Sequence, residues 1–205
     1  MLSGNRQRWA DDARERFGAL YERLPGWEIG RPQPAFAELH RRGAIGSCVL
    51  DAGCGTGESA LFLAAQGHQV WGIDIVDAAI SAAVEKARQR GLPSARFLVH
   101  DALALDQLGL EFDTVVDSGL LHAMTDAEQG IYLDQVRGVL RPGGSVHVLC
   151  FSEHQPGDTG PRRVKRAELE RLFGAGWREL SIVETRFAVN FSDDGAAAYL
   201  ASAQK

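Results

Sequence analysis

The chain has 205 residues, a formal net charge of −5 at pH 7, and 45% hydrophobic against 24% charged residues. This size and composition are typical of one globular domain with a sizeable core. The acidic balance argues against a nucleic-acid substrate, because contacts to a phosphate backbone require a basic surface. The three cysteines lack C-x-x-C spacing, which argues against a zinc site or a disulfide framework.

The sequence also lacks signals for membranes and metals. No apolar run approaches the ~18 residues that a membrane-spanning helix needs, and the first residues do not read as a signal peptide. No acidic residues have the clustered spacing of a magnesium site. We therefore expect a cytoplasmic protein without membrane contact or bound metal. The oligomeric state is left open, a monomer included.

In chain order, the first expected element is an amphipathic helix over residues 5–23. Its apolar residues recur at three- and four-residue steps, which places them on one face of a helix. They are Trp9, Ala13, Phe17, Leu20 and Leu24.

Residues 24–34 contain too much proline and glycine for regular structure, and residues 35–42 can form a short helix. Residues 1–43 then have two interpretations: a helix packed on the sheet with a plain connector, or a helical lid over the cofactor and acceptor. We favour the lid, with Trp27, Arg31 and Gln33 facing the site, because irregular segments of compact domains are often functional.

The strongest pattern lies at residues 49–74, which predict a strand, a glycine-rich loop, a helix and a second strand. The loop reads D-x-G-x-G-x-G, with Asp51 followed by Gly53, Gly55 and Gly57. Glycine permits backbone angles and a close approach that other residues forbid. This unit is half of a doubly wound nucleotide fold, whose ligand lies beyond the strand ends and over the helix N-terminus.

The same loop favours a nucleoside ligand without phosphates. A dinucleotide fingerprint has its third glycine where this chain has Glu58, a carboxylate that would repel a pyrophosphate. No Gly-Lys-Ser/Thr follows, so the loop is not a Walker loop. Asp74, at the end of the second strand, is placed to accept hydrogen bonds from ribose hydroxyls.

Strands and helices alternate beyond this unit. Further strands are expected over residues 95–100, 112–119, 145–151 and 177–189, and helices over 77–91, from the Thr125–Glu128 capping box onward, and over 166–173. The strands are continuously apolar, as in sheets covered on both faces, and the mid-strand His147 is expected in the core.

These elements predict an α/β fold. We expect a doubly wound, Rossmann-like, seven-stranded and mostly parallel sheet, with helices on both faces and an antiparallel strand at one edge. A single domain over residues 1–205 would then comprise the lid, a core over 44–191 and a weakly ordered tail over 192–205.

The glycine loop and the acid after the next strand resemble motif I of the class I S-adenosylmethionine-dependent methyltransferases. The L-R-P-G-G turn before the strand at 145–151 resembles the same family. Three further segments look like a bacterial small-molecule group that includes the heterocyclic toxin methyltransferase and is distantly similar to thiopurine methyltransferases. They are W-x-I-G-R-P-Q-P-A-F at 27–36, D-S-G-L-L-H at 117–122 and P-G-D-x-G-P-R-R-V at 156–164.

The resemblance implies S-adenosyl-L-methionine as the cofactor and S-adenosyl-L-homocysteine as its product. It also implies that Asp101 binds the adenine amino group and that the neighbouring backbone amide holds a ring nitrogen. The residues expected to bind the cofactor are Trp27, Arg31, Gln33, Asp51, Ala52, Gly53, Gly55, Gly57, Asp74, Ile75, Asp101, Ala102 and Ser118.

The implied reaction is methyl transfer by in-line displacement to an oxygen or nitrogen of a small aromatic or heterocyclic acceptor. His122 follows a strand end and is the candidate base or acceptor-orienting group, unless it merely packs at a helix start. Arg162 and Arg163 either neutralise an acidic acceptor or form a solvated pair, and Tyr21 either lines the pocket or packs on the helix surface.

Three alternative functions stay open: S-methylation of small thiols or thiopurines, methylation of protein or RNA, and non-catalytic binding of the cofactor. A nicotinamide oxidoreductase shares the fold, but Glu58 argues against it.

Overall fold

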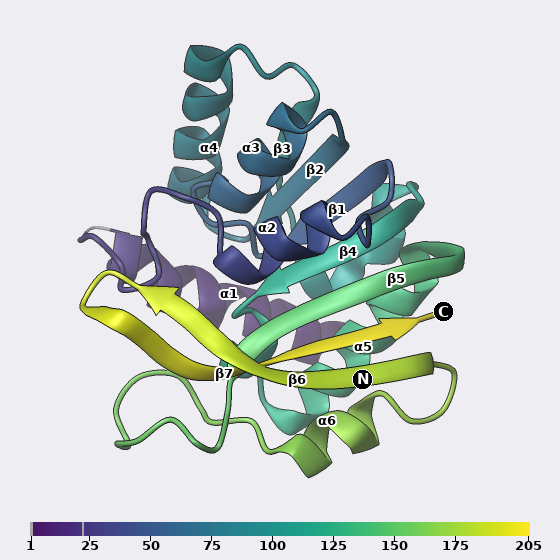
Figure 1. The fold of residues 1–205 in the computed structure, drawn as a ribbon. Coiled ribbons are helices and arrows are strands. Elements are labelled where there is room, and N and C mark those ends of the chain that lie inside the picture. The colour runs from purple at the N-terminus through teal and green to yellow at the C-terminus, as the bar shows by residue number, and fades with distance from the viewer. Residues whose placement is uncertain (1, 22) are drawn as a thin grey trace.

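The computed structural model describes residues 2–21 and 23–205 and shows one seven-stranded sheet in the order β3-β2-β1-β4-β5-β7-β6 (Figure 1). Five neighbouring strands run parallel: β1 (Cys48–Ala52), β2 (Gln69–Asp74), β3 (Ala95–Val99), β4 (Phe112–Ser118) and β5 (Leu140–Phe151). The strand order reverses at β1, which lies between β2 and β4. The predicted doubly wound sheet is confirmed, and its reversal point is where such folds bind ligands.

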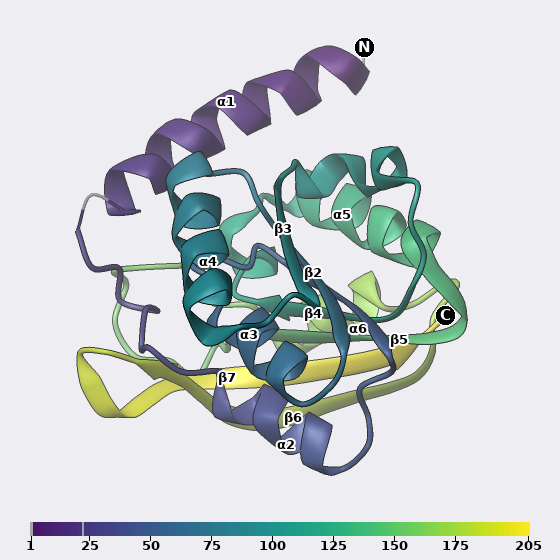
Figure 2. The same ribbon diagram turned by 90° about the horizontal axis from the view of Figure 1, so that it is seen from above.

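Helices cover both faces of the sheet. One core packs around η1 (Ala102–Leu108), α5 (Asp126–Val139) and α6 (Arg166–Leu172), and the other around α2 (Pro34–Arg41), α3 (Glu58–Ala65) and α4 (Asp77–Arg90). Figure 2 shows α5 and α2 on opposite sides of the sheet. The predicted capping box of α5 is present, with the Thr125 hydroxyl accepting from the Glu128 N–H and the Glu128 carboxylate accepting from the Thr125 N–H.

The N-terminal helix α1 (Leu2–Tyr21) lies outside the two helical layers, against α4 (Figure 2). Ala13 is buried there, and Phe17 and Tyr21 pack on a small cluster that includes Ile75. The helix predicted over 5–23 is therefore present as far as Tyr21. Glu22 lies outside the described residues, as does the side chain of Trp9.

The expectation of a weakly ordered tail over 192–205 is wrong. These residues form β7 (Ser192–Gln204), which lies between β5 and the edge strand β6 (Arg178–Val189) and runs antiparallel to both. Its small side chains allow this insertion, since Ala196, Ala198 and Ala201 are all buried. The antiparallel strand expected near one edge is thus β7.

His147 on β5 is buried as expected, with Nδ1 at 2.8 Å from the Ser202 hydroxyl and Nε2 at 3.2 Å from the Ala44 carbonyl oxygen. Within the described residues, no helix is long and apolar enough to cross a bilayer.

Candidate active site

A cavity of about 430 Å³ opens at the carboxyl ends of β1, β2 and β4. That volume is in the range of small-molecule and cofactor sites. Most residues predicted for the site line it: Tyr21, Trp27, Arg31, Gln33, Asp51, Gly53, Gly55, Gly57, Asp74, Ile75, Ala102, Ser118, His122 and Arg163. Three predicted residues are not among the described lining residues: Ala52, Asp101 and Arg162.

The glycine loop is shaped as a cradle. Gly53, Gly55 and Gly57 have φ angles of +68°, +54° and +88°, which other residues rarely adopt. A Cβ on Gly53 would lie 3.0 Å from Leu120, and one on Gly55 would lie 2.8 Å from the Tyr21 hydroxyl. Side chains at these positions would therefore collide with the cavity walls, and glycine keeps the backbone open to a ligand.

Asp74 lies beside this loop at the end of β2. Its Oδ2 accepts the N–H of Gly55 and its Oδ1 accepts the N–H of Val76, each over 2.9 Å. Burial raises the pKa of Asp74, while these backbone donors favour the ionised form. Each oxygen keeps a lone pair for a further donor, so the carboxylate has the capacity to accept two ligand hydroxyls, and its contact with a ribose stays a prediction.

Asp51 lies under the same loop and is 1% exposed. Neither of its oxygens has a hydrogen-bond partner among the described residues. Native proteins seldom leave a buried carboxyl without a partner, so this orphaned group points to a ligand. Ala52, which follows Asp51 on β1, is fully buried and packs in the hydrophobic core.

The residues predicted to bind adenine follow β3. Ile75, His100 and Ala102 line the cavity. The Oδ1 of Asp101 instead accepts the N–H of Leu103 over 2.8 Å and so caps η1. The predicted adenine contact of Asp101 therefore stays a prediction.

Several residues of the segment 23–33 line the cavity, among them Trp27, Arg31 and Gln33, and the lid interpretation of residues 1–43 stays a prediction. Trp27 packs edge-on against Phe17 and Tyr21, with ring centroids 6.4 and 6.1 Å apart. Gln33 is buried, and its amide donates to the Ala188 carbonyl over 3.0 Å and accepts the Ala188 N–H over 2.8 Å. The Gln33 amide thus joins the lid to β6, whereas the prediction gave it to the cofactor.

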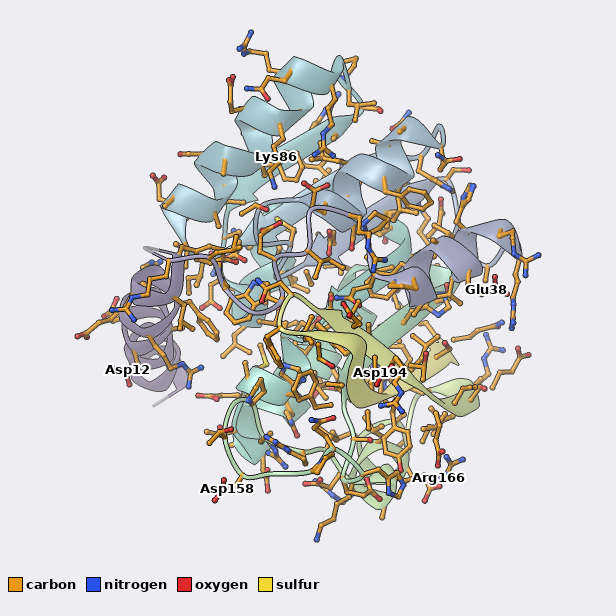
Figure 3. All side chains as sticks on the ribbon, turned by 60° about the vertical axis from the view of Figure 1, so that its left-hand side comes forward. Asp12, Glu38, Lys86, Asp158, Arg166 and Asp194 are labelled. Carbon is orange, nitrogen blue, oxygen red and sulfur yellow. The ribbon has the colours of Figure 1, made fainter. Side chains whose placement is uncertain are left out.

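An ion-pair cluster connects Glu28 of the segment 23–33 to α4 and the glycine loop. Lys86 on α4 (labelled in Figure 3) donates to the Thr56 hydroxyl over 2.6 Å and to Glu58 over 2.8 Å, and lies 3.6 Å from Glu28 of the lid. Thr56 donates to Glu28, and Arg90 pairs with Glu58 over 2.9 Å. Sequence patterns do not predict this cluster, because its members lie on three separate segments of the chain.

Tyr21 reaches the glycine-loop side of the cavity, with its hydroxyl close to Gly55. Burial and the charge of Asp74 raise its pKa, so the phenol stays protonated and cannot serve as a base.

His122 lies on the short helix η2 (Leu121–Ala123) at the opposite end of the cavity. Its Nδ1 accepts the backbone N–H of Phe151 over 3.0 Å, and its ring lies 5.0 and 5.9 Å from the rings of Phe151 and Phe187. Burial and the positive charge of Arg163 lower the pKa of His122 to about 3. The ring is therefore neutral and carries its proton on Nε2, where it can donate to a ligand.

The two neighbouring arginines have different surroundings. Arg163 lines the cavity, and its guanidinium donates to the carbonyl oxygens of Thr159 (2.8 Å), Pro156 (3.2 Å) and Pro161. No carboxylate pairs with it among the described residues. Arg162 instead pairs with two carboxylates, Asp126 and Glu168, and takes no part in the cavity.

The loop that holds Arg163 extends to the edge of the molecule, where Figure 3 labels Asp158. Together with the lid and the β6–β7 turn at Phe191, it encloses the far side of the cavity. The cavity therefore has one half over the glycine loop and an aromatic half beside His122, in a fold of the Rossmann-like class.

Comparison with known proteins names the class. A family profile described as "Methyltransferase domain" matches residues 49–144. The 2-heptyl-1-hydroxyquinolin-4(1H)-one methyltransferase of Mycobacteroides abscessus is 34% identical over 177 residues, which cover 84% of this chain and 78% of that protein. The chain belongs to the S-adenosylmethionine-dependent methyltransferases, and S-adenosylmethionine is its cofactor.

Two solved structures agree with this assignment. The first is a structure whose description is "Conversion of a Disulfide Bond into a Thioacetal Group during Echinomycin Biosynthesis". Its sequence is 35% identical to this chain, the match covers 94% of this chain and 92% of that one, and the TM-score is 0.83. The other is the 1,6-didemethyltoxoflavin-N1-methyltransferase of Burkholderia thailandensis with bound S-adenosylhomocysteine. It is 24% identical over the whole of this chain and 88% of its own, with a TM-score of 0.69, and shares the fold.

Proposed function

We propose that the protein methylates an oxygen or nitrogen of a small aromatic or heterocyclic acceptor. The acceptor lies in the half of the cavity bounded by His122, Phe151 and Phe187, and the cofactor lies over the glycine loop. The observation that carries this proposal is the pairing of an aromatic wall with two polar groups, the His122 Nε2–H and the Arg163 guanidinium, whose charge no carboxylate of the described residues balances.

The aromatic wall suits a flat ring. Phe151 and Phe187 pack edge-on, with centroids 5.3 Å apart, and both line the cavity beside the imidazole. A further ring can pack against these side chains in the offset or edge-on arrangements that aromatic rings prefer. His122, Phe151 and Phe187 are all buried, and burial at this end strengthens the charge interactions of a bound acceptor.

The two donors suit an acceptor that binds as an anion. When bound, the cofactor supplies an already activated methyl group, so the protein's contribution is placement. Arg163 offers a positive charge without a carboxylate partner, and the His122 Nε2–H offers a directed donor. Both would stabilise the oxygen of an ionised phenol or N-hydroxy heterocycle and hold it in place.

This arrangement does not require an enzymic base. A neutral His122 whose Nδ1 is occupied cannot take a proton at Nε2, so the geometry supports the orienting role over the base. An acidic hydroxyl loses its proton to solvent before it binds. The relative from M. abscessus, whose name specifies a 1-hydroxyquinolinone substrate, supports an acceptor of this kind.

A small thiol is the second candidate acceptor. The solved structure connected with echinomycin biosynthesis concerns a reaction at a disulfide, and its coverage of this chain is nearly complete. A thiolate would meet the same two donors, because its negative charge is also localised on one atom.

The test is an acceptor panel with S-adenosylmethionine as methyl donor. The panel contains 1-hydroxyquinolin-4(1H)-one, a phenol, an aromatic thiol and a neutral aniline, with products identified by mass spectrometry. We expect methylation of the acidic hydroxyl compounds above that of the aniline. Preference for the thiol would establish the second candidate. Methylation of the aniline alone would overturn the anionic acceptor in favour of a neutral nitrogen, and no product from any of the four compounds would contradict the proposal.

A further inference from the structure

A glutamine lies in the buried stripe of α5, where apolar side chains are expected. Gln129 is fully buried and shares its face of the helix with Tyr132, Leu133 and Val136, which pack in the hydrophobic core. Its Oε1 has no hydrogen-bond partner within the part of the chain that the structure describes. A buried amide with an unpaired oxygen destabilises a core, so core packing alone does not account for this residue.

The nitrogen of the same amide has a specific partner. Nε2 of Gln129 donates to the carbonyl oxygen of Leu121, the first residue of η2, over 3.0 Å. That carbonyl belongs to the peptide group between Leu121 and His122. Because a peptide group is planar, its orientation fixes where the backbone of His122 begins. Gln129 therefore acts on the backbone that carries the imidazole.

Asp117 holds the same short helix from the end of β4. Its Oδ1 accepts the N–H of Leu120 over 2.7 Å, and its Oδ2 accepts the N–H of Leu121 over 3.0 Å. On the outer side, the exposed Arg16 of α1 donates to the Ala123 carbonyl oxygen over 3.1 Å. Solvent can replace that outer bond, whereas a buried bond lies in a low dielectric and is stronger. The buried bonds of Asp117 and Gln129 are thus the firm supports of η2.

The imidazole of His122 has little freedom of its own. Its Nδ1 accepts the N–H of Phe151 over 3.0 Å, and its ring centroid lies 5.9 Å from that of Phe187. On the other side of the ring, a Cβ built on Gly119 would lie 3.0 Å from Nε2. A shift of η2 would therefore press the ring on its neighbours or break the bond to Phe151. The direction of the Nε2–H thus depends on the peptide group that Gln129 holds.

We propose that Gln129 is a positioning residue of the acceptor site, whose amide holds the Leu121 carbonyl and so directs the Nε2–H of His122 toward the acceptor. The inference rests on the proposed function, because it extends the orienting role of His122. Gln129 itself does not line the cavity. Its effect on methyl transfer should therefore pass entirely through His122.

Gln129→Met tests the bond with little change in volume. The Leu121 carbonyl oxygen also accepts the N–H of Met124 over 3.2 Å, so the substitution leaves it paired. The unpaired Oε1 disappears as well, and we expect the urea midpoint to stay near that of the wild type. Gln135→Met is the matched control, the same change on the same helix. The Gln135 Oε1 accepts the N–H of Asp106 over 3.0 Å and has no bond to η2.

Kinetics with an acidic hydroxyl acceptor measure the effect. Gln129→Met should lower kcat/KM by about tenfold, because a misplaced orienting group loses rate. The affinity for S-adenosylhomocysteine should not change, and Gln135→Met should match the wild type. Added to His122→Ala, Gln129→Met should cause no further loss, since coupled residues are not additive. Wild-type activity of Gln129→Met, or an equal loss in both backgrounds, would overturn the proposal.

Nitrogen NMR of protein labelled with 15N-histidine gives a readout without an acceptor. The chain has six histidines, and the His122 signals are those that disappear in His122→Ala. We expect one sharp pair in the wild type and in Gln135→Met, with Nδ1 unprotonated and Nε2 protonated. In Gln129→Met the pair should shift or broaden as the bond to Phe151 loosens.

An unchanged pair of His122 signals in Gln129→Met would overturn the proposal. Loss of folding in both Gln129→Met and Gln129→Leu would do the same, because it would give Gln129 a purely structural role. Failure of the acceptor panel would contradict the proposed function and leave the NMR result intact. The two conclusions can therefore fail separately.

Discussion

The backbone N–H of Phe151 donates to Nδ1 of His122 over 3.0 Å, and this bond fixes the proton of the ring on Nε2. Because burial and Arg163 keep the ring neutral, the nitrogen that remains for a ligand is a donor. The residue that the sequence suggested as a base or an orienting group therefore suits only the second role. Its effect on catalysis should come through placement of the acceptor.

Replacing His122 tests this role. We expect His122→Ala to lower kcat/KM for an acidic hydroxyl acceptor by about ten- to hundredfold, the usual range for a hydrogen bond to a charged group. The affinity for S-adenosylhomocysteine should stay near that of the wild type, because His122 lies at the other end of the cavity. His122→Gln, which keeps an N–H donor, should recover part of the loss. Turnover of His122→Ala equal to wild type would remove His122 from the site.

The two neighbouring arginines form a matched pair of variants. Arg163→Met should raise the KM of an anionic acceptor by about tenfold or more, because a desolvated charge interaction is lost. Arg162→Met should leave that KM unchanged and lower stability by about 1 kcal/mol or less, since its ion pairs with Asp126 and Glu168 are partly exposed. Steady-state kinetics and urea unfolding of both variants measure these effects. A larger KM change in Arg162→Met would reverse the assignment.

Asp74 should dominate cofactor affinity. A ribose diol can form two hydrogen bonds to its carboxylate, each contributing ~1.5–3 kcal/mol. Asp74→Ala should therefore weaken S-adenosylmethionine binding by ~3 kcal/mol or more, about a hundredfold. The loss of the Gly55 and Val76 bonds to Asp74 would act in the same direction by loosening the loop. A change below about threefold in calorimetry would mean that the carboxylate does not bind the ribose.

His147 should make stability fall in acid. Burial lowers its pKa to about 4, so the unfolded chain takes up a proton below about pH 6.5 that the folded chain refuses. The stability of the wild type relative to His147→Gln should therefore decrease by about 2 kcal/mol between pH 6.5 and 4.5. His154→Gln, at an exposed histidine, is the control. Denaturant unfolding at both pH values measures the difference, and a gap that does not change with pH would contradict the assignment.

The sequence predicted the parts of the structure that depend on local patterns. The glycine loop, the strands that flank it, the capping box of α5 and the acid at position 74 each follow from spacing or turn chemistry, and the structure contains all of them. The central parallel strands were also predictable, because continuous apolar runs leave few alternatives.

The missed features depend on contacts between distant segments. The strand β7 contains Asp193, Asp194, Gly195 and a run of alanines, which have low strand propensity. It forms because its backbone pairs with both β5 and β6, which local patterns do not reveal. The different surroundings of Arg162 and Arg163 arise from α5 and a folded loop. Adjacent residues of the same type cannot be told apart by pattern alone.

The most direct test of the account is the pH dependence of kcat/KM for two hydroxyl acceptors of different acidity. If the acceptor binds as an anion at Arg163 and His122, the rate should rise with pH and level off at the pKa of each acceptor in turn. The midpoint should then move when one acceptor replaces the other. A midpoint that stays at one pH for both acceptors would reveal an enzymic base and contradict the central claim.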